Sequence, residues 1–431
     1  MSVGLERLRS DADRLRLAAV DKGEDPALVD RALDLDERRR SLVAEGDALK
    51  AVRNDASRQI GEAIRGGANP SGPEVTELKA ASASTAERIG AIDNDLATIE
   101  ADLDDAMLRI PNPADPDVPV GGEEATITVR TWGEPLPHEG RKPHWDVAEA
   151  LGMIDSARGA KVTGSGWPVY LGAGATLQRA LIGWFLDVHS REHGMTEVWP
   201  PVLVNADSAR GTGQIPDKED QMYVVTRDDL YLIPTAEVPV TNLHRDEILD
   251  AAALPIRYAA YSASFRREAG AAGRDTRGIL RIHQFDKVEM VSFTRPEDSS
   301  EELEWLTARA ESLLQRLGLA YRVLLMSTRE MGFVQAKKFD LEVWAPGVER
   351  WLEVSSVSNF RDYQARRMAV RYRPEAGAKA ELVHTLNGSA LALPRTVAAI
   401  LETYQQEDGS VMVPEVLQPA FGGRERIGPP G

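Results

Sequence analysis

Two long apolar stripes separated by a breaker-rich segment constrain the fold of this 431-residue chain more than any other feature. The first stripe repeats every seven residues, at Leu35, Leu42, Leu49 and Ala56. The second follows the alternating three-and-four spacing of a coiled-coil seam, at Leu78, Thr85, Ile89, Ile92, Leu96, Ile99 and Leu103. The segment GGANPSGP, residues 66–73, lies between them. We therefore predict an antiparallel helical hairpin from about residue 30 to residue 108. Periodicity alone also fits a dimerisation element or a spacer.

The chain changes character after this hairpin. Four prolines in residues 110–121 end the helix and indicate a linker. Beyond it, short alternating segments such as ATITVRTW and ELVHTL are interspersed with helical stretches, a mixture typical of an α+β domain. We predict a helical hairpin domain in residues 1–110, a linker in residues 111–121 and an α+β domain in residues 122–431.

Composition excludes several classes of protein. The chain has no cysteine, which rules out disulfides, thiol nucleophiles and cysteine-ligated zinc. No apolar run approaches the roughly 20 residues of a membrane span, and the N-terminus lacks the apolar core of a secretory signal. We expect a cytoplasmic protein with no membrane partner. A net charge of -17 repels polyanions, so an RNA partner would need local basic patches.

An arginine-rich segment, Ser264 to Val291, is the strongest chemical signal. Its glycines disfavour regular structure, so we predict a loop between two strands. The loop carries five arginines: Arg266, Arg267, Arg274, Arg277 and Arg281. Guanidinium groups suit phosphate because they present a planar donor fork and keep their charge. The segment predicts a phosphate-binding loop, although a solvated charged loop fits the same residues.

The start of this segment, Phe265-Arg266-Arg267-Glu268, resembles the Phe-Arg-x-Glu core of motif 2 in the class II aminoacyl-tRNA synthetases, and the sequence from Glu268 to Val288 resembles the seryl enzymes in particular. Residues 194–205 resemble motif 1, with its proline at Pro201, and residues 386–423 resemble motif 3, with its arginine at Arg395. Further matches to the seryl enzymes are Thr235-Ala236-Glu237, Glu289 and Glu353-Val354-Ser355-Ser356. The resemblance covers nearly the whole chain.

This resemblance implies a fold and a reaction. The fold would be a mixed, mainly antiparallel sheet flanked by helices. Serine would attack the α-phosphate of ATP to give seryl-adenylate, and the terminal ribose hydroxyl of serine tRNA would then take the acyl group. Fixed positive charge and positioning are what a protein contributes to such phosphate chemistry.

For ATP, the resemblance implies that Arg266 binds the α-phosphate, Arg395 lies on the γ-phosphate side and Glu268 holds the adenine or ribose end. Residues Glu353, Val354, Ser355 and Ser356 complete the ATP site. Glu353 and Ser356 supply hard oxygen ligands for Mg²⁺. Arg266, Arg395 and Glu353 are the expected catalytic residues. Taken singly, Arg395 also fits a surface arginine at a helix start, and Glu353 a strand-end glutamate.

For L-serine, the resemblance places Glu289 and Ser389 around the hydroxyl group and Thr235, Ala236, Glu237 and Asn387 around the rest of the amino acid. Glu237 would be the counter-charge of the ammonium group. A pocket that hydrogen-bonds a hydroxyl rejects the analogue lacking it by roughly 10⁴ to 10⁵. By itself, Glu289 fits a strand-surface ion pair with Lys287 as well.

The resemblance also gives the hairpin a role. It implies a homodimer in which the arm reaches across to the long variable arm of serine tRNA, so that RNA shape and backbone are recognised. The exposed-looking bases that could meet phosphates are Arg53, Arg58, Arg65, Lys79 and Arg88.

The chain departs from the family at three places: residues Thr328 to Gly332, Val357, and Gly166-Trp167. These departures leave room for a specialised paralogue that resists an inhibitor or serves a biosynthetic pathway. A ligase that charges a carrier protein is a second alternative, but such relatives are expected to lack the full hairpin. A non-catalytic RNA-binding paralogue is a third, although it need not retain Arg266, Glu268, Glu353 and Arg395.

Overall fold

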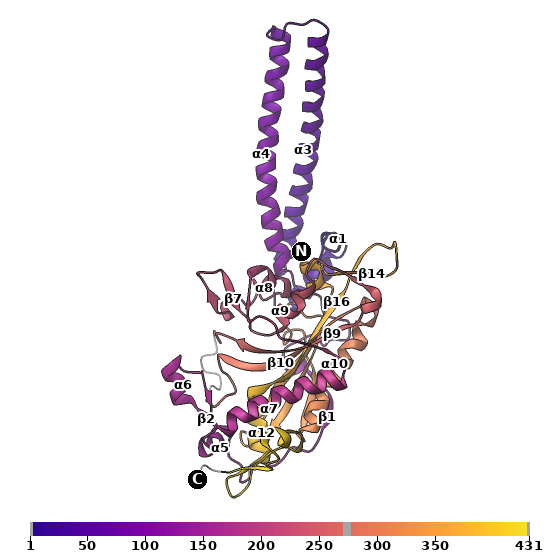
Figure 1. Cartoon of the computed structure of the whole chain (residues 1–431). Helices are drawn as coiled ribbons and strands as arrows, with labels where there is room; N and C mark the ends of the chain where they lie inside the picture. The colour runs from indigo at the N-terminus through magenta and orange to yellow at the C-terminus, as the bar shows by residue number, and fades with distance from the viewer. Residues whose placement is uncertain (1–2, 270–276, 429–431) are drawn as a thin grey trace. The chain divides into compact units, whose positions relative to one another are not determined.

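The computed structural model describes residues 3–269 and 277–428, and the chain forms two compact units. The smaller unit is Met1–Val20 with Glu24–Ile110, and the larger is Asp21–Gly23 with Pro111–Gly431. The smaller unit contains four helices within its described part (Figure 1): α1 (Leu5–Ser10), α2 (Ala12–Lys22, which ends in the larger unit), α3 (Ala27–Arg65) and α4 (Pro73–Arg109).

The long helices α3 and α4 form the predicted antiparallel hairpin. Ile89, Ile92 and Leu103 are buried in the seam, as the spacing requires. Gly46 of α3 packs against Ile92, where an added Cβ would lie 3.5 Å from Ile92 Cγ2. Pro73 begins α4, a position at which its missing N–H costs nothing. The hairpin prediction is confirmed, with ends one to three residues beyond those expected.

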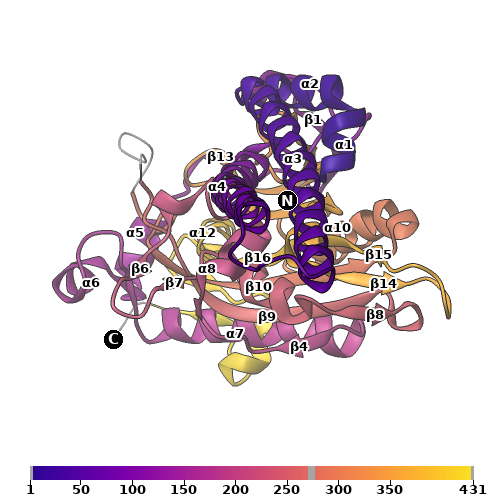
Figure 2. The same ribbon diagram turned by 90° about the horizontal axis from the view of Figure 1, so that it is seen from above.

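The larger unit is built on a mixed sheet. Within the described residues its eight strands follow the order β1 (Ile127–Trp132), β11 (Tyr321–Leu325), β12 (Lys337–Ala345), β13 (Arg350–Arg361), β16 (His384–Ala392), β10 (Gln284–Thr294), β9 (Ile256–Phe265) and β4 (Thr196–Val198). Every neighbouring pair is antiparallel except β4 with β9. Figure 2 shows β16, β10, β9 and β4 in succession. The α+β prediction and the mainly antiparallel sheet are confirmed.

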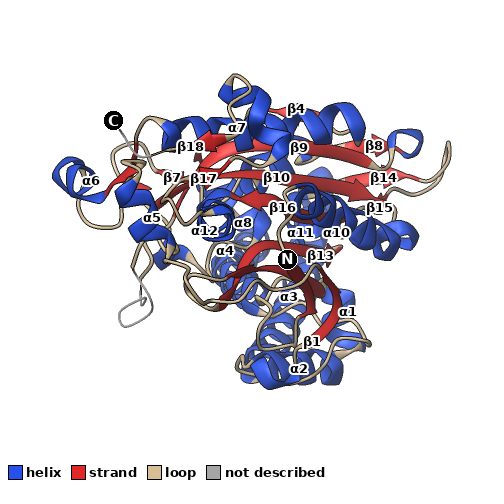
Figure 3. Cartoon of the chain, turned by 90° about the horizontal axis from the view of Figure 1, so that it is seen from below, coloured by secondary structure: helices blue, strands red, loops and turns tan. Residues whose placement is uncertain are grey.

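Helices pack along this sheet and bury an extended hydrophobic core (Figure 3). The core joins strand residues such as Met290 and Leu341 to Phe185 of α7, Leu306 of α10 and Leu401 of α12. The helices of this unit are α5 (His144–Ala150), α6 (Ser156–Val162), α7 (Ala173–Asp187), α8 (Ala206–Thr212), α9 (Glu237–Thr241), α10 (Ser299–Arg316), α11 (Tyr363–Met368) and α12 (Leu393–Tyr404). Along the described chain, no helix combines the length and apolarity needed to cross a bilayer.

Short strands complete the unit in small sheets and pairs. They are β2 (Ile154–Asp155) with β3 (Val169–Tyr170); β5 (Leu203–Val204), β7 (Leu230–Leu232) and β6 (Val224–Val225); β15 (Glu381–Leu382), β14 (Arg371–Arg373) and β8 (Ile248–Asp250); and β17 (Val411–Met412) with β18 (Arg426–Ile427).

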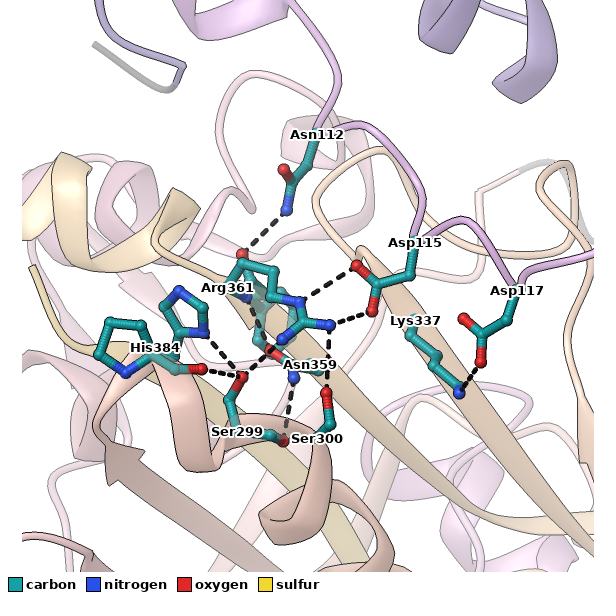
Figure 4. A network of polar contacts seen from close by, with 11 residues as sticks. Asn112, Asp115, Asp117, Ser299, Ser300, Lys337, Asn359, Arg361 and His384 are labelled. Carbon is teal, nitrogen blue, oxygen red and sulfur yellow. Dashed lines mark hydrogen bonds and ion pairs between the residues drawn. The ribbon is translucent and has the colours of Figure 1, made fainter.

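Residues 111–121, the predicted linker, are tied to β12 and β13 (Figure 4). Asn112 Nδ2 donates to the carbonyl oxygens of Val334 and Phe360, at 3.0 and 2.9 Å. The carboxylate of Asp115 accepts two hydrogen bonds from the guanidinium of Arg361. These contacts satisfy the polar groups of a segment that its prolines keep out of regular structure.

Candidate active site

A cavity of about 620 Å³ opens in the larger unit. Its wall contains both described ends of the β9–β10 loop and parts of β12, β13, β16 and the start of α12. Eleven of the predicted ATP-binding and serine-binding residues line it: Thr235, Glu237, Arg266, Glu268, Glu353, Val354, Ser355, Ser356, Asn387, Ser389 and Arg395. The structure therefore brings together side chains that are up to 160 positions apart. Ala236 and Glu289 are buried outside the lining of the cavity.

Strand register explains the convergence. On the antiparallel pair β10 and β16, Glu289 stands opposite Ser389 and Val291 opposite Asn387. On the other side of β16, the hydroxyl of Ser355 on β13 donates to the carbonyl oxygen of Ser389 at 2.6 Å. Because opposed residues on neighbouring strands lie about 5 Å apart, three distant segments meet at one place on the sheet.

Glu289 lies at the centre of a buried polar cluster. Its carboxylate accepts from Lys287 Nζ at 2.5 Å, from Asn387 Nδ2 at 2.8 Å and from Ser389 Oγ at 3.3 Å. Lys287 also donates to Thr235 Oγ1 at 2.8 Å. The ion pair with Lys287 is real, but both partners are buried, so it is not the strand-surface pair that Glu289 alone would also fit. Three donors compensate the desolvation of the carboxylate.

Glu237 supplies a second buried carboxylate, which lines the cavity. It accepts from Gln364 Nε2 at 2.7 Å and from Asn387 Nδ2 at 3.0 Å. Burial and the negative charge of Glu289 raise the pKa of Glu237 to about 7. Asn387 Oδ1 is buried and, among the described residues, has no hydrogen-bond partner. Glu237 and Asn387 therefore present acceptors suited to a cationic group to the cavity.

Glu353 and Arg395 form a second, more highly charged cluster in the cavity wall. The Nη1 atom of Arg395 donates to the backbone carbonyl of Glu353 at 2.8 Å and lies 3.6 Å from its Oε2. Ser356 Oγ donates to Glu353 Oε1 at 3.0 Å. Although desolvation opposes it, the charges of Arg395, Lys338 and Arg266 lower the pKa of Glu353. The carboxylate is therefore ionised at neutral pH.

Arg266 and Glu268 begin the predicted phosphate-binding loop, which does run between two strands, β9 and β10. The Arg266 guanidinium lies over the Phe285 ring, 5.1 Å from its centroid, and faces the cavity. Glu268 accepts from Arg281 Nη1 at 2.5 Å. Arg274 falls outside the described residues, so its predicted place in the loop has no structural description.

Sequence reasoning missed two neighbouring charged residues of β12. Lys338 lines the cavity, and its Nζ lies 2.9 Å from Asp340 Oδ2. Asp340 stands opposite Ser356 on β13, and burial raises its pKa to about 7. Period-two alternation in KKFDLEVW places both residues on one face of a strand. Nothing in the sequence indicates that this face lies beside Ser356.

Two of the three departures from the family lie at or beside the cavity. Glu330, Met331 and Gly332 contribute to its wall. Trp167 stacks on His283 at the base of the β9–β10 loop, with ring centroids 5.6 Å apart. Val357, the third departure, is fully buried in the core behind the site.

The predicted tRNA-binding bases lie along α3 and α4. Arg58 pairs with Asp55, and Arg88 Nη2 lies 2.8 Å from Glu45 Oε1. Arg65 and Lys79 donate to backbone carbonyls and are exposed. Arg53 is half-buried, which corrects its expected exposure.

Comparison with known proteins agrees with these observations. Residues 4–114 match the seryl-tRNA synthetase N-terminal domain, and residues 223–404 match the tRNA synthetase class II core domain (G, H, P, S and T). The serine–tRNA ligase of Thermomicrobium roseum is 54% identical, over 98% of this chain and 94% of its own length. That of Gemmatimonas aurantiaca is 51% identical, over 96% and 97%.

A solved structure, the seryl-tRNA synthetase of Pyrococcus horikoshii complexed with ATP, superposes with a TM-score of 0.92 at 38% identity. It covers 99% of this chain and 100% of its own. Identity above half with full-length relatives, a shared fold and matches to both domains lead to one conclusion. The chain belongs to the seryl-tRNA synthetase family of class II aminoacyl-tRNA synthetases.

Proposed function

We propose that this chain joins L-serine to the 3′ end of serine tRNA, using ATP to form seryl-adenylate. Its relatives are named serine–tRNA ligases, and the matching Pyrococcus structure is an ATP complex. The observation that carries the proposal is the presence of two kinds of polar cluster in the wall of one cavity. Buried acceptors around Glu237 form one cluster, and Arg266, Glu353 and Arg395 form the other.

In the acceptor cluster, Glu237 and the free Oδ1 of Asn387 bind the ammonium group of serine. Ser389 lines the cavity and recognises the serine hydroxyl. Glu289, which does not line the cavity itself, accepts a hydrogen bond from Ser389 Oγ and so orients the side chain that meets the serine hydroxyl. Thr235 is fixed by Lys287, and Ala236 is packed behind it. A buried, pre-oriented polar set of this kind penalises amino acids that lack the hydroxyl.

Beside the charged cluster of Arg266, Glu353 and Arg395, a carboxylate oxygen of serine attacks the α-phosphorus of ATP and pyrophosphate leaves. Negative charge develops on the phosphate oxygens, and Arg266 stabilises it as the α-phosphate ligand, with Arg395 on the γ-phosphate side. Glu268, held by Arg281, receives the adenine or ribose end. The terminal ribose hydroxyl of tRNA then attacks the seryl carbonyl, and AMP leaves.

The charged cluster around Glu353 also fits a magnesium ion. The Glu353 carboxylate, kept ionised, and the adjacent Ser356 hydroxyl are hard oxygen donors of the type Mg²⁺ prefers. They supply two ligands, so phosphate oxygens and water would complete the shell. When bound, Mg²⁺ neutralises charge on the ATP phosphates. Val354 and Ser355 form the strand backbone that holds this pair at the cavity wall.

The raised pKa of Glu237 predicts a pH-dependent affinity for serine. Only the ionised carboxylate pairs with the ammonium group, and with a pKa of about 7 most copies are protonated below that pH. Serine affinity should therefore rise about tenfold between about pH 6 and about pH 8. The measurement is the serine KM in pyrophosphate exchange. Glu237→Gln should bind serine weakly with a flat profile, and a flat wild-type profile would contradict the assignment.

Serine-dependent exchange of pyrophosphate into ATP tests the proposed function directly. Exchange with serine, but with little response to threonine, alanine or glycine, supports activation. Charging of serine tRNA that depends on its long variable arm supports the acceptor. Exchange without tRNA charging would favour a carrier-protein ligase, and no exchange would favour a non-catalytic paralogue.

We assign tRNA binding to residues 1–110, a linker to residues 111–121 and catalysis to residues 122–431. Arg53, Arg58, Arg65, Lys79 and Arg88 are the proposed phosphate contacts on the hairpin. The reaction is placed in the cytoplasm, where ATP and tRNA are present. A specialised paralogue stays the alternative to a housekeeping enzyme, because residues 330–332, where the chain departs from the family, lie in the cavity wall.

A homodimer is the expected assembly, formed through the segment that resembles motif 1. Trp199 in this segment is 77% exposed and is followed by exposed Val202 and Leu203. Such an apolar surface beside an edge strand of the sheet favours an interface. Light scattering should give twice the chain mass of 47.2 kDa. Trp199→Glu should lower the measured mass toward that of a single chain. A wild-type protein of single-chain mass would overturn the dimer.

A further inference from the structure

A buried histidine–carboxylate pair lies outside the lining of the cavity. Its histidine belongs to none of the motifs above, and its glutamate lies in the segment that resembles motif 3 but has been given no role there. His144 begins α5, Glu402 lies in α12, and both are completely buried. Glu402 Oε1 accepts from the backbone N–H of His144 at 2.9 Å and from its Nδ1 at 2.8 Å. Glu402 Oε2 accepts from the backbone N–H groups of Gly347 and Val348. Four donors hold this carboxylate, which fixes the imidazole ring.

The Nε2 side of the ring contacts the part of the β9–β10 loop that leads into β10. The backbone N–H of Ile279 donates to His144 Nε2 at 3.3 Å. Since Nε2 is the acceptor there, the proton sits on Nδ1, where it is donated to Glu402. At Gly278, with φ of +72°, an added Cβ would lie 2.2 Å from Nε2. The loop backbone therefore runs directly against the ring, and only glycine fits at this position.

The next two residues of the loop reach the cavity. The carbonyl oxygen of Leu280 accepts from Arg395 Nε at 3.3 Å. Arg281 donates to Glu268 at 2.5 Å, and both Leu280 and Arg281 line the cavity. The backbone that His144 fixes is thus one to two residues from the groups that orient Arg395 and Glu268. His144 itself is not among the lining residues.

We propose that His144 and Glu402 form a positioning device that holds residues 278–281 in the ATP-binding arrangement. The inference rests on the proposed function and extends it to two residues that touch no substrate. Glu402 fixes the orientation of the imidazole ring, and the ring fixes the position of the Ile279 backbone. That backbone in turn positions Leu280 and Arg281, the partners of Arg395 and Glu268. The device spans α5, the loop and α12, so it links the loop to the core of the larger unit.

Two substitutions at position 144 separate the two hydrogen bonds of the ring. An asparagine amide reaches the Nδ1 position and keeps the bond to Glu402, but it has no atom at the Nε2 position. A glutamine amide reaches the Nε2 position and can accept from Ile279. His144→Asn should weaken ATP binding roughly three- to tenfold, the loss of one net hydrogen bond, with serine affinity changed by less than about twofold. His144→Gln should recover most of the ATP affinity.

The readouts are the ATP dissociation constant by calorimetry, the separate KM values in exchange, and hydrogen exchange of the Ile279 amide. That amide should exchange faster in His144→Asn than in wild type or His144→Gln. The matched control is His189→Asn, which alters another fully buried histidine whose Nδ1 contacts His193 outside the cavity. It should lower the melting temperature without changing ATP affinity.

If both His144 variants keep wild-type ATP affinity and wild-type exchange of the Ile279 amide, the positioning role is wrong. It is also wrong if both variants lose ATP affinity equally and in proportion to their loss of stability. These binding and exchange readouts do not require turnover. A wild-type protein that binds ATP but shows no serine-dependent exchange would therefore contradict the proposed function. The positioning role of His144 and Glu402 would still be tested by ATP affinity and Ile279 exchange.

Discussion

Replacing Arg266 with alanine is expected to lower the rate of serine-dependent pyrophosphate exchange by about 10²- to 10³-fold. The Arg266 guanidinium faces the cavity over the Phe285 ring, so its charge is available to the α-phosphate. An oriented positive charge in a partly desolvated cavity stabilises the transition state more than it would in water. The loss should appear mainly in kcat, because negative charge on the phosphate grows as the reaction proceeds.

The adjacent residue offers a matched control. Arg267 carries the same charge, but its Nη1 donates to the carbonyl oxygen of Asp220, and it does not line the cavity. Arg267→Ala should retain exchange within about threefold of wild type, which is the range of lost surface charge interactions. The exchange rate of Arg266→Lys should lie between those of the wild type and Arg266→Ala, because lysine keeps the charge and loses the planar fork. Equal effects of the two alanine variants would contradict the assigned role of Arg266.

Shortening the hairpin is expected to reduce serine-tRNA charging at least about a hundredfold and leave pyrophosphate exchange unchanged. Gly46 and Ile92 face each other across the helices, so residues 47–91 can be replaced by a short turn at this level. The deletion removes all five proposed phosphate contacts: Arg53, Arg58, Arg65, Lys79 and Arg88. The proposed catalytic residues lie in the larger unit, so activation should not depend on the deleted segment.

Salt dependence and a charge-retaining variant make this test specific. Charging by the wild type should weaken steeply as salt rises, because bound phosphates release counterions, and the shortened protein should have a flatter slope. A variant with Arg58 and Arg65 changed to lysine keeps the charge and should charge tRNA within about tenfold of wild type. Undiminished charging by the shortened protein would overturn the proposed role of the hairpin.

Local patterns were enough to predict the hairpin and the position of the arginine-rich segment between two strands. Seven-residue spacing determines which face of a helix is apolar, so the seam at Ile89, Ile92 and Leu103 could be predicted before any contact was known. The glycines among the arginines of that segment disfavour regular structure, so composition predicted a connection between two strands, and the segment does connect β9 with β10. The individual roles of Arg266, Glu353 and Arg395 came from resemblance, because each residue alone fits an ordinary surface position.

Long-range contacts, in contrast, were decided only by the tertiary structure. The sequence did not reveal that Glu289 would be buried with Lys287 below the cavity, or that Asp340 would lie opposite Ser356. His144 and Glu402 are 258 positions apart, and no periodicity links them. Helix periodicity and turn composition act through neighbouring residues, so the sequence by itself determined the elements and their apolar faces. Strand register and burial depend on which segments meet after folding, so only the tertiary structure decided which charges share the active site.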